Sequence, residues 1–398
     1  MSDVQRRARW IAPLPVVAQF AWTRRGPGLA PRDARDSEVL RSELGGSRLA
    51  ATETMTKPLS FALALTTLLI ACSEPSEGSP DDGASASAAA LAGNASDFGG
   101  ARTLAAGESI AVVSTCKLPM APAPSAIRVT QNVVYASPNG APQRLDVVEP
   151  TAPGPHPLVV LVHGGGWTTG DKSGMRRLAE SLASVGFVAA AVNYRLAKDD
   201  GSNAFPAPVS DVRCAVRWLR ANAGRYGIDS ARVASVGASA GAHLSAMLGV
   251  GARVSALDDG TCPAPLAAQP VSVRAVAGFY TPTDFRDASV WLANDNAGAG
   301  VINLLGGPID ADPALAALAS PITHVSARSA PFFLAHGTAD ATVPVAQSDT
   351  FEAALHGAGA KATLVKLEGA EHAFPVLSPQ YPVTSCTLLA FLNKYLAP

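Results

Sequence analysis

The sequence has few charged side chains and no excess of either sign. Lysine and arginine number 31 and aspartate and glutamate 32, which leaves a formal net charge of −1. A chain without a basic excess has little to neutralise a phosphate backbone, so we expect no nucleic-acid partner. Charged residues make up 16% of the chain and hydrophobic residues 48%, a balance that excludes an unfolded polyelectrolyte. The chain can therefore bury a large globular core.

Metal-binding pairs, internal repeats and long apolar runs are also missing. No Cys-x-x-Cys or His-x-x-x-His pair occurs among the five cysteines and seven histidines, so we expect neither a metal nor another cofactor. No repeat period indicates a solenoid or a propeller. No apolar run reaches the roughly 20 residues that a membrane-spanning helix needs. A globular chain without internal repeats is expected to form one main folded domain.

Residues 55–71 have the composition of an export signal. Lys57 is followed by about a dozen mostly apolar residues, and small residues then precede Cys72. The end of this segment, Leu69-Ile-Ala-Cys72, resembles the lipobox of bacterial lipoproteins. The resemblance implies that Cys72 is acylated and anchors an exported protein to the cell envelope, and Ser73 after it favours the outer membrane.

The signal segment divides the chain. If Met55 is the biological start, residues 1–54, with nine arginines and no lysine, are a spurious and disordered extension. Residues 72–115 are predicted to be a flexible tether, because 73–100 is almost entirely Ser, Ala, Gly, Pro and Asp and has too few large apolar side chains to offset the entropy of ordering. Residues 116–398 form the predicted catalytic domain.

The catalytic domain alternates short β-branched runs with helical ones, a pattern typical of an α/β fold with a mainly parallel sheet. The central runs are continuously apolar, as in strands that are buried on both faces. Ser210 is expected to cap a helix that runs to Ala223. The candidate strands are residues 127–135, 144–148, 158–163, 187–194, 232–237, 273–280, 331–336 and 362–367.

The run Gly237-Ala-Ser239-Ala-Gly241 joins one of these strands to a helix. A sharp strand-to-helix turn strains the serine backbone and requires small residues two positions before and after it. Gly237 and Gly241 meet this requirement. Ser239 is therefore the predicted nucleophile, with its hydroxyl exposed above the carboxyl end of the sheet.

A serine hydroxyl needs an imidazole to take its proton and a carboxylate to orient that imidazole. Asp340 follows the strand at 331–336 and His372 follows the strand at 362–367, which gives the chain order Ser, Asp, His of the α/β-hydrolases. We assign His372 as general base and Asp340 as orienting acid. Asp284, after the strand at 273–280, and Glu371, beside the histidine, are the alternative acids.

The run His163-Gly-Gly-Gly-Trp167 directly follows a buried strand. Glycines let the main chain approach a substrate closely, and a tetrahedral oxyanion needs backbone N–H groups aimed at it. Gly165, Gly166 and Ala240 are the predicted donors of this oxyanion hole. Trp167, Phe285 and Trp291 are candidates for lining the substrate pocket.

In these motifs the chain resembles the α/β-hydrolase esterases of the hormone-sensitive-lipase-like and BD-FAE-like groups. The resemblance covers residues 127–396 and implies an α/β-hydrolase fold with helices on both faces and a small lid insertion, residues 284–331, after the sixth strand. Thr281 and Glu371 stand where these groups usually have glycine, but neither removes a catalytic atom. The matching motifs include His163-Gly-Gly-Gly-Trp167, Asn193-Tyr-Arg-Leu-Ala197, Gly237-Ala-Ser-Ala-Gly241, Thr283-Asp-Phe285 and His336-Gly-Thr-Ala-Asp340.

Several side chains are expected to be structural. Arg195 and Asp211 resemble a buried ion pair that steadies the active-site loops, and His243 is expected to be a hydrogen-bonded core histidine. If Cys72 is lipidated, the remaining four cysteines permit two disulfides with three possible pairings, among which the sequence does not choose. These four are Cys116, Cys214, Cys262 and Cys386.

The motifs together predict an exported, membrane-tethered serine carboxylesterase. Its expected substrates are small-molecule esters or acetyl and feruloyl esters on polysaccharides, hydrolysed through an acyl-enzyme. Two alternatives remain. One is an amidase or peptidase of the same fold, such as a kynurenine-formamidase-like enzyme, which has the same triad. The other is a surface-binding lipoprotein that has the hydrolase fold but no catalytic activity.

Overall fold

The computed structural model describes residues 106–118 and 124–398. The predicted extension at 1–54, the signal segment at 55–71, Cys72 and the first part of the tether lie outside the described residues and stay predictions. All described residues belong to one compact unit. Among them, no helix has the length and apolar character needed to cross a bilayer.

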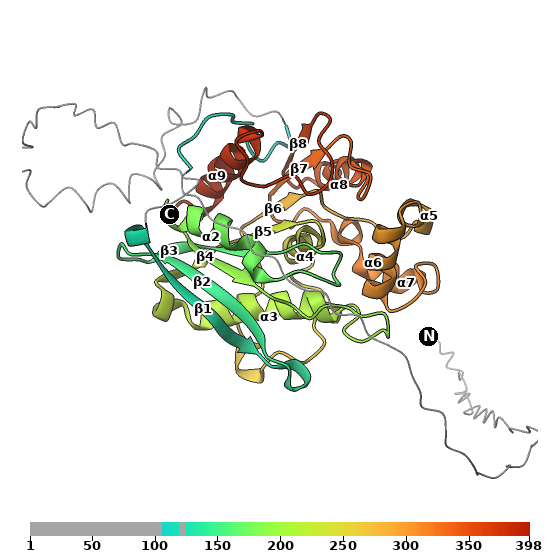
Figure 1. The fold of residues 1–398 in the computed structure, drawn as a ribbon, viewed down its shortest axis with the longest axis horizontal. Helices are drawn as coiled ribbons and strands as arrows, with labels where there is room; N and C mark the ends of the chain where they lie inside the picture. The colour runs from blue at the N-terminus through green and yellow to red at the C-terminus, as the bar shows by residue number, and fades with distance from the viewer. Residues whose placement is uncertain (1–105, 119–123) are drawn as a thin grey trace, which may run out of the picture. The chain divides into compact units, whose positions relative to one another are not determined.

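An eight-stranded sheet in the order β1-β2-β4-β3-β5-β6-β7-β8 forms the centre of the unit (Figure 1). The pairs β1/β2 and β2/β4 are antiparallel and all other neighbours are parallel, so the predicted mainly parallel sheet is confirmed. All eight predicted strands are present, with ends shifted by a few residues. They are β1 Ile127–Ala136, β2 Gln143–Pro150, β3 His156–Val162, β4 Val188–Val192, β5 Ile228–Ala238, β6 Ala275–Phe279, β7 Phe332–Gly337 and β8 Ala362–Leu367.

Helices cover both faces of the sheet (Figure 1). Every residue of β3 is buried, which explains its continuous apolar sequence. Leu158 and Val160 pack toward α3 (Ala207–Ala221) and α4 (Ala240–Val250), whereas Val159 packs on the opposite face toward α2 (Arg176–Ala183) and α9 (Pro382–Leu396). The side of α4 also carries α8, Ala346–Gly357.

Helix α3 begins at Ala207, three residues before the predicted cap, and ends at Ala221 rather than Ala223. Pro208 lies in its first turn, where a missing N–H costs no hydrogen bond. Ser210 is therefore inside the helix and does not cap it. Its hydroxyl instead donates to Asp259 at 2.7 Å.

Two disulfides, Cys116–Cys386 and Cys214–Cys262, select one of the three possible pairings. The first joins the 106–118 segment to α9. In this segment the backbone N–H of Ser109 donates to Ala362 of β8, and Val113 is buried. Residues 106–115 were included in the predicted tether, 72–115, but here they lie against the sheet edge, because this part of the chain regains apolar side chains.

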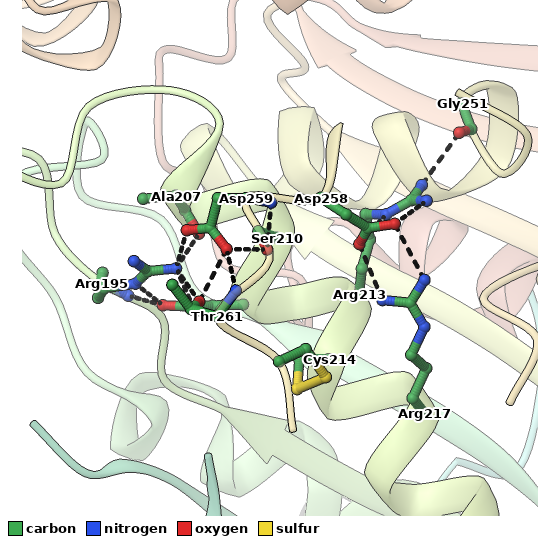
Figure 2. Close-up of polar contacts among 12 residues, drawn as sticks. Arg195, Ala207, Ser210, Arg213, Cys214, Arg217, Gly251, Asp258, Asp259 and Thr261 are labelled. Carbon is green, nitrogen blue, oxygen red and sulfur yellow. Dashed lines mark hydrogen bonds and ion pairs between the residues drawn. A yellow bond between two sulfur atoms is a disulfide. The ribbon is translucent and has the colours of Figure 1, made fainter. Parts of the chain in front are cut away.

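The segment after α4, residues 251–263, is bound to α3 through a carboxylate (Figure 2). Asp258 accepts two hydrogen bonds from Arg213, at 3.0 and 2.9 Å, and two from Arg217, at 2.8 and 3.0 Å. Burial opposes ionisation of Asp258, but the two guanidinium groups outweigh it and hold the pKa of the carboxyl well below its ordinary value of 3.8.

This lowered pKa makes the stability contribution of Asp258 depend on pH. The ion pairs stabilise the folded chain fully above the unfolded-state pKa, and the stabilisation is lost as pH falls from 3.8 toward the lower folded-state pKa. Asp258→Asn is therefore expected to lower the free energy of unfolding by about 1 to 3 kcal/mol at pH 7, with a smaller difference below pH 3.8. Urea unfolding at both pH values measures it. The exposed Asp310→Asn change is the control, and equal effects of the two substitutions would contradict the prediction.

Candidate active site

The turn between β5 and α4 holds Ser239 in a strained backbone conformation, with φ 53° and ψ −124°. This strand-to-helix turn, the Ser239 elbow, is closely packed on both sides. A Cβ at Gly237 would overlap the Gly241 carbonyl, and one at Gly241 would overlap the carbonyl of Val162 on β3. Both glycines are therefore required by close backbone contact, as the motif predicts. The backbone N–H of Ser239 donates to Phe279 of β6 at 2.9 Å, which fixes the turn over the centre of the sheet.

The structure brings the three predicted triad residues together from the ends of β5, β7 and β8. The Ser239 Oγ lies 3.0 Å from His372 Nε2, and His372 Nδ1 lies 2.7 Å from Asp340 Oδ2. A carboxylate can only accept, so Nδ1 carries the proton. Nε2 is then free to accept the proton of the serine hydroxyl.

Asp340 is fully buried at its side chain and is surrounded by donors. Burial raises its pKa, but hydrogen bonds from His336, His372 and the Val343 backbone outweigh burial and hold the pKa well below the usual range. His336 Nε2 lies 3.2 Å from Asp340 Oδ2 and 2.8 Å from the Val343 carbonyl oxygen. Since both partners are acceptors, Nε2 is protonated. The sequence analysis did not identify this contact between His336 and Asp340.

Neither alternative acid reaches the histidine ring. The Asp284 carboxylate accepts hydrogen bonds from the Arg286 side chain at 2.8 and 2.7 Å. Glu371 is exposed although it adjoins His372 in the chain. The geometry therefore favours Asp340 over both.

The loop after β3, residues 163–172, carries the predicted oxyanion donors. Gly165 has φ +117°, and a Cβ there would clash with the Thr169 backbone. In the described part of the chain, the N–H groups of Gly165 and Gly166 donate no hydrogen bond to the protein. Ala240 is the first residue of α4, so its N–H has no acceptor within the helix. These donors are available to a ligand.

A cavity of about 570 Å³ opens at this position. It is lined by Gly165, Gly166, Ser239 and His372. The insertion after β6 forms another wall, chiefly through helix α6, Asp295–Leu305. The insertion also contains α5, Ala288–Leu292, and α7, Pro313–Ala319. It lies at the active site as predicted, and its action as a lid stays a prediction.

Two of the three predicted pocket aromatics line this cavity, Trp167 and Trp291. The prediction for Phe285 is wrong, because its side chain is fully buried and does not line the cavity. It packs edge-on against Trp167 and against His243, with ring centroids 5.6 and 5.1 Å apart. Phe285 therefore supports the pocket wall from behind.

His243 is the core histidine that the sequence predicted. Its Nδ1 accepts a hydrogen bond from Trp167 Nε1 at 3.0 Å, and its Nε2 donates to the Ala319 carbonyl at 2.8 Å. Burial lowers its pKa to about 4. A neutral His243 thus connects the loop after β3, residues 163–172, to the insertion.

A second cavity of about 510 Å³ adjoins the first. The two share Gly164, Ala238, Tyr280 and Ala373 as walls. Tyr280 was missed by the sequence analysis. Its φ of 44° at the end of β6 is unusual for a tyrosine, and its ring lies edge-on to His372 at 4.7 Å. The further lining of the second cavity includes Asp171, Ser173, Arg177 and Phe374.

Within residues 106–118 and 124–398, no group of three or more His, Cys, Asp or Glu side chains is placed to hold a metal ion.

The model of the BD-FAE family matches residues 145–355, more than half of the chain. The chain belongs to the BD-FAE family. The matched region contains Ser239 and Asp340 and ends before His372, which the structure places beside them. This membership, the sheet and the structural relatives below confirm the predicted α/β-hydrolase fold.

This BD-FAE chain is similar to several esterases. Esterase LipQ of Mycobacterium tuberculosis is 33% identical over 250 residues, which cover 62% of this chain and 57% of LipQ. The chain spans little more than half the length of the curated relatives it matches. Among solved structures, esterase 2 of Thermogutta terrifontis with propionate bound is 28% identical, with a TM-score of 0.55, and the match covers 69% of this chain and 96% of that one. A truncated carbohydrate esterase from gut microbiota is 25% identical, with a TM-score of 0.55 and coverages of 69% and 99%.

Proposed function

We propose that this protein is a serine carboxylesterase. The observation that carries the proposal is the continuous hydrogen-bonded line from Ser239 Oγ through His372 to Asp340 beside free backbone donors. The printed names of the relatives, Esterase LipQ and esterase 2, support an ester rather than another substrate.

The proposed reaction starts with attack of Ser239 Oγ on the ester carbonyl carbon while His372 Nε2 takes the hydroxyl proton. The N–H groups of Gly165, Gly166 and Ala240 stabilise the oxyanion that forms. The C–O bond to the alcohol then breaks, and His372 gives its proton to the leaving alcohol. Water, activated by the same imidazole, releases the acid from the acyl-enzyme and restores Ser239.

The two adjoining cavities support a substrate with two distinct parts. The first contains the nucleophile and Trp291, and its volume fits a short acyl chain or an aromatic acyl group such as ferulate. The second has hydrogen-bonding groups on Asp171 and Ser173 and an aromatic face on Phe374, which suit a hydroxylated alcohol such as a sugar. We therefore propose small-molecule or polysaccharide-linked acetyl and feruloyl esters as substrates.

A matched pair of substrates tests the reaction class. The kcat/KM for 4-nitrophenyl acetate is expected to exceed that for 4-nitroacetanilide by at least about 100-fold, a difference of about 2.7 kcal/mol in barrier, because the oxyanion donors serve both but the amine is the poorer leaving group. Equal or faster turnover of the anilide would favour an amidase. If the folded protein hydrolyses neither substrate, the result would favour a non-catalytic binding protein. Turnover of methyl ferulate would then indicate that the site accepts an aromatic acyl group. Turnover of acetylated xylan would indicate that it accepts acetyl groups on a polysaccharide.

We further propose that the protein is exported and anchored by a lipid on Cys72. Two disulfides support an oxidising compartment, and the acyl chains of a lipoprotein cysteine would hold the protein at a membrane. Cys72→Ser is expected to move the protein from the membrane fraction to the soluble fraction of the producing bacterium. A variant that stays with the membranes would contradict the anchor.

A further inference from the structure

The oxyanion loop, residues 163–172, is held by residues 193–197, which follow β4. The Tyr194 hydroxyl donates to the His163 carbonyl at 3.0 Å, and the two rings stack with centroids 4.4 Å apart. The N–H of Ala197 donates to the Trp167 carbonyl at 2.9 Å. The position of the oxyanion loop therefore depends on where residues 193–197 are held.

Arg195 lies between Tyr194 and Ala197 in the chain, and its side chain contacts the carboxylates of Asp211 and of the partly buried Asp259 (Figure 2). The Asp211 carboxylate, on α3, accepts three hydrogen bonds from Arg195 at 2.7 to 2.8 Å. The donors are the backbone N–H, Nε and Nη2 of Arg195. The predicted ion pair is thus present. Nη2 has two protons, and its second short contact is with Asp259 Oδ2 at 2.6 Å.

Asp259 is not needed to neutralise Arg195, because Asp211 already does so. It comes instead from the 251–263 segment, far from Arg195 in the chain, and its other oxygen accepts from Ser210 Oγ and from Thr261 Oγ1, both at 2.7 Å. The carboxylate therefore joins three parts of the chain: the start of α3, the 251–263 segment and residues 193–197.

The Cys214–Cys262 disulfide fixes this junction. Cys214 lies one helical turn after Ser210 on α3, and Cys262 lies three residues after Asp259. The covalent bond therefore limits how far Asp259 can move from Ser210 and Arg195. A continuous path runs from the disulfide through Asp259 and Arg195 to the backbone of the oxyanion loop.

We propose that Asp259 is a positioning residue for the oxyanion loop and that the Cys214–Cys262 disulfide holds Asp259 in place. Full turnover then requires Cys214 and Cys262 to be joined as a disulfide. The inference rests on the proposed esterase function, since the loop supplies two of its three oxyanion donors. Asp259 touches no substrate and acts only through Arg195.

Asp259→Asn in the full chain tests the proposal, with Asp258→Asn as matched control. Both changes remove one carboxylate charge from the same segment, but only Asp259 contacts Arg195. We expect Asp259→Asn to lower kcat for 4-nitrophenyl acetate by about 10-fold with KM within about 2-fold, because the donors act mainly in the transition state. Asp258→Asn should lower stability and leave kcat within about 2-fold. Equal kcat losses in the two variants would overturn the proposal.

The role of the disulfide is tested by pairs of alanine substitutions. Cys214→Ala with Cys262→Ala should lower kcat to about the level of Asp259→Asn, and combining all three changes should give no further loss, since they act on one path. Cys116→Ala with Cys386→Ala should leave kcat unchanged. Full turnover without Cys214 and Cys262 would overturn the role of the disulfide, and Asp259→Asn tests the positioning even if the cysteine variant fails to fold.

Hydrogen exchange separates this proposal from the esterase proposal. Backbone amides in residues 163–172 should exchange faster in Asp259→Asn than in the parent chain, and at the parent rate in Asp258→Asn. This result supports the positioning role even for a protein that hydrolyses none of the esters tested. Unchanged exchange and unchanged kcat in Asp259→Asn would refute the role of Asp259.

Discussion

Ser239→Ala is expected to lower kcat/KM for 4-nitrophenyl acetate by at least about 10³-fold, because alanine has no oxygen to form the acyl-enzyme. The methyl group fits the elbow, so the circular dichroism spectrum and the melting temperature should match those of the parent chain. Stopped-assay kinetics with purified variant measures the loss. Ser230→Ala, at an exposed serine away from the cavity, is the control and should keep parent activity.

A folded Ser239→Ala protein with activity within about 10-fold of the parent would reject the nucleophile. A loss of at least about 10³-fold would instead agree with the hydrogen bond between Ser239 and His372 in the structure.

Asp340→Asn is expected to lower kcat by about 10³- to 10⁴-fold. The asparagine amide can donate to His372 Nδ1, which shifts the imidazole proton to Nε2 and removes the acceptor for the Ser239 hydroxyl. The loss should appear in kcat more than in KM, because the acid touches no substrate. Steady-state kinetics from pH 6 to 9 measures both.

Asp284→Asn is the matched control, because Asp284 was one of the two alternative acids and follows β6 as Asp340 follows β7. Its carboxylate is bound to Arg286, so we expect kcat within about 3-fold of the parent. A large loss at Asp284 together with near-parent activity at Asp340 would reverse the assignment.

The strands and the triad were predictable because local chemistry determines them. Continuous apolar runs such as that of β3 indicate strands buried on both faces, and Gly237 and Gly241 are dictated by backbone contacts that any such elbow makes. Ser239, Asp340 and His372 each follow a strand of this parallel sheet, and the three meet because the carboxyl ends of parallel strands lie at one edge.

Other features depend on contacts between distant segments and have no local signal. Phe285 was expected in the pocket, but an irregular segment has no periodicity to show that its ring turns inward toward Trp167. Tyr280 lines both cavities because of a positive φ that the sequence of β6 does not reveal. The pairing of Asp259 with Arg195 joins residues 64 positions apart, so it could be found only in the folded chain.

The boundary of the domain shows a similar effect. The predicted tether extended to residue 115, yet Ser109 and Val113 are buried against the sheet edge and α9. The apolar side chains that return in this short segment, together with hydrogen bonds to β8 and α9 and the Cys116–Cys386 disulfide, hold it against the domain.

Covalent labelling tests the central claim, that Ser239 is the nucleophile of an esterase, most directly. The purified protein is treated with diethyl 4-nitrophenyl phosphate, which transfers a diethylphosphoryl group to an activated serine, and peptide mass spectrometry locates the adduct. We predict one adduct on Ser239, with ester hydrolysis lost in proportion to the labelled fraction. An adduct on another residue that abolishes activity, or full esterase activity in protein labelled at Ser239, would contradict the account.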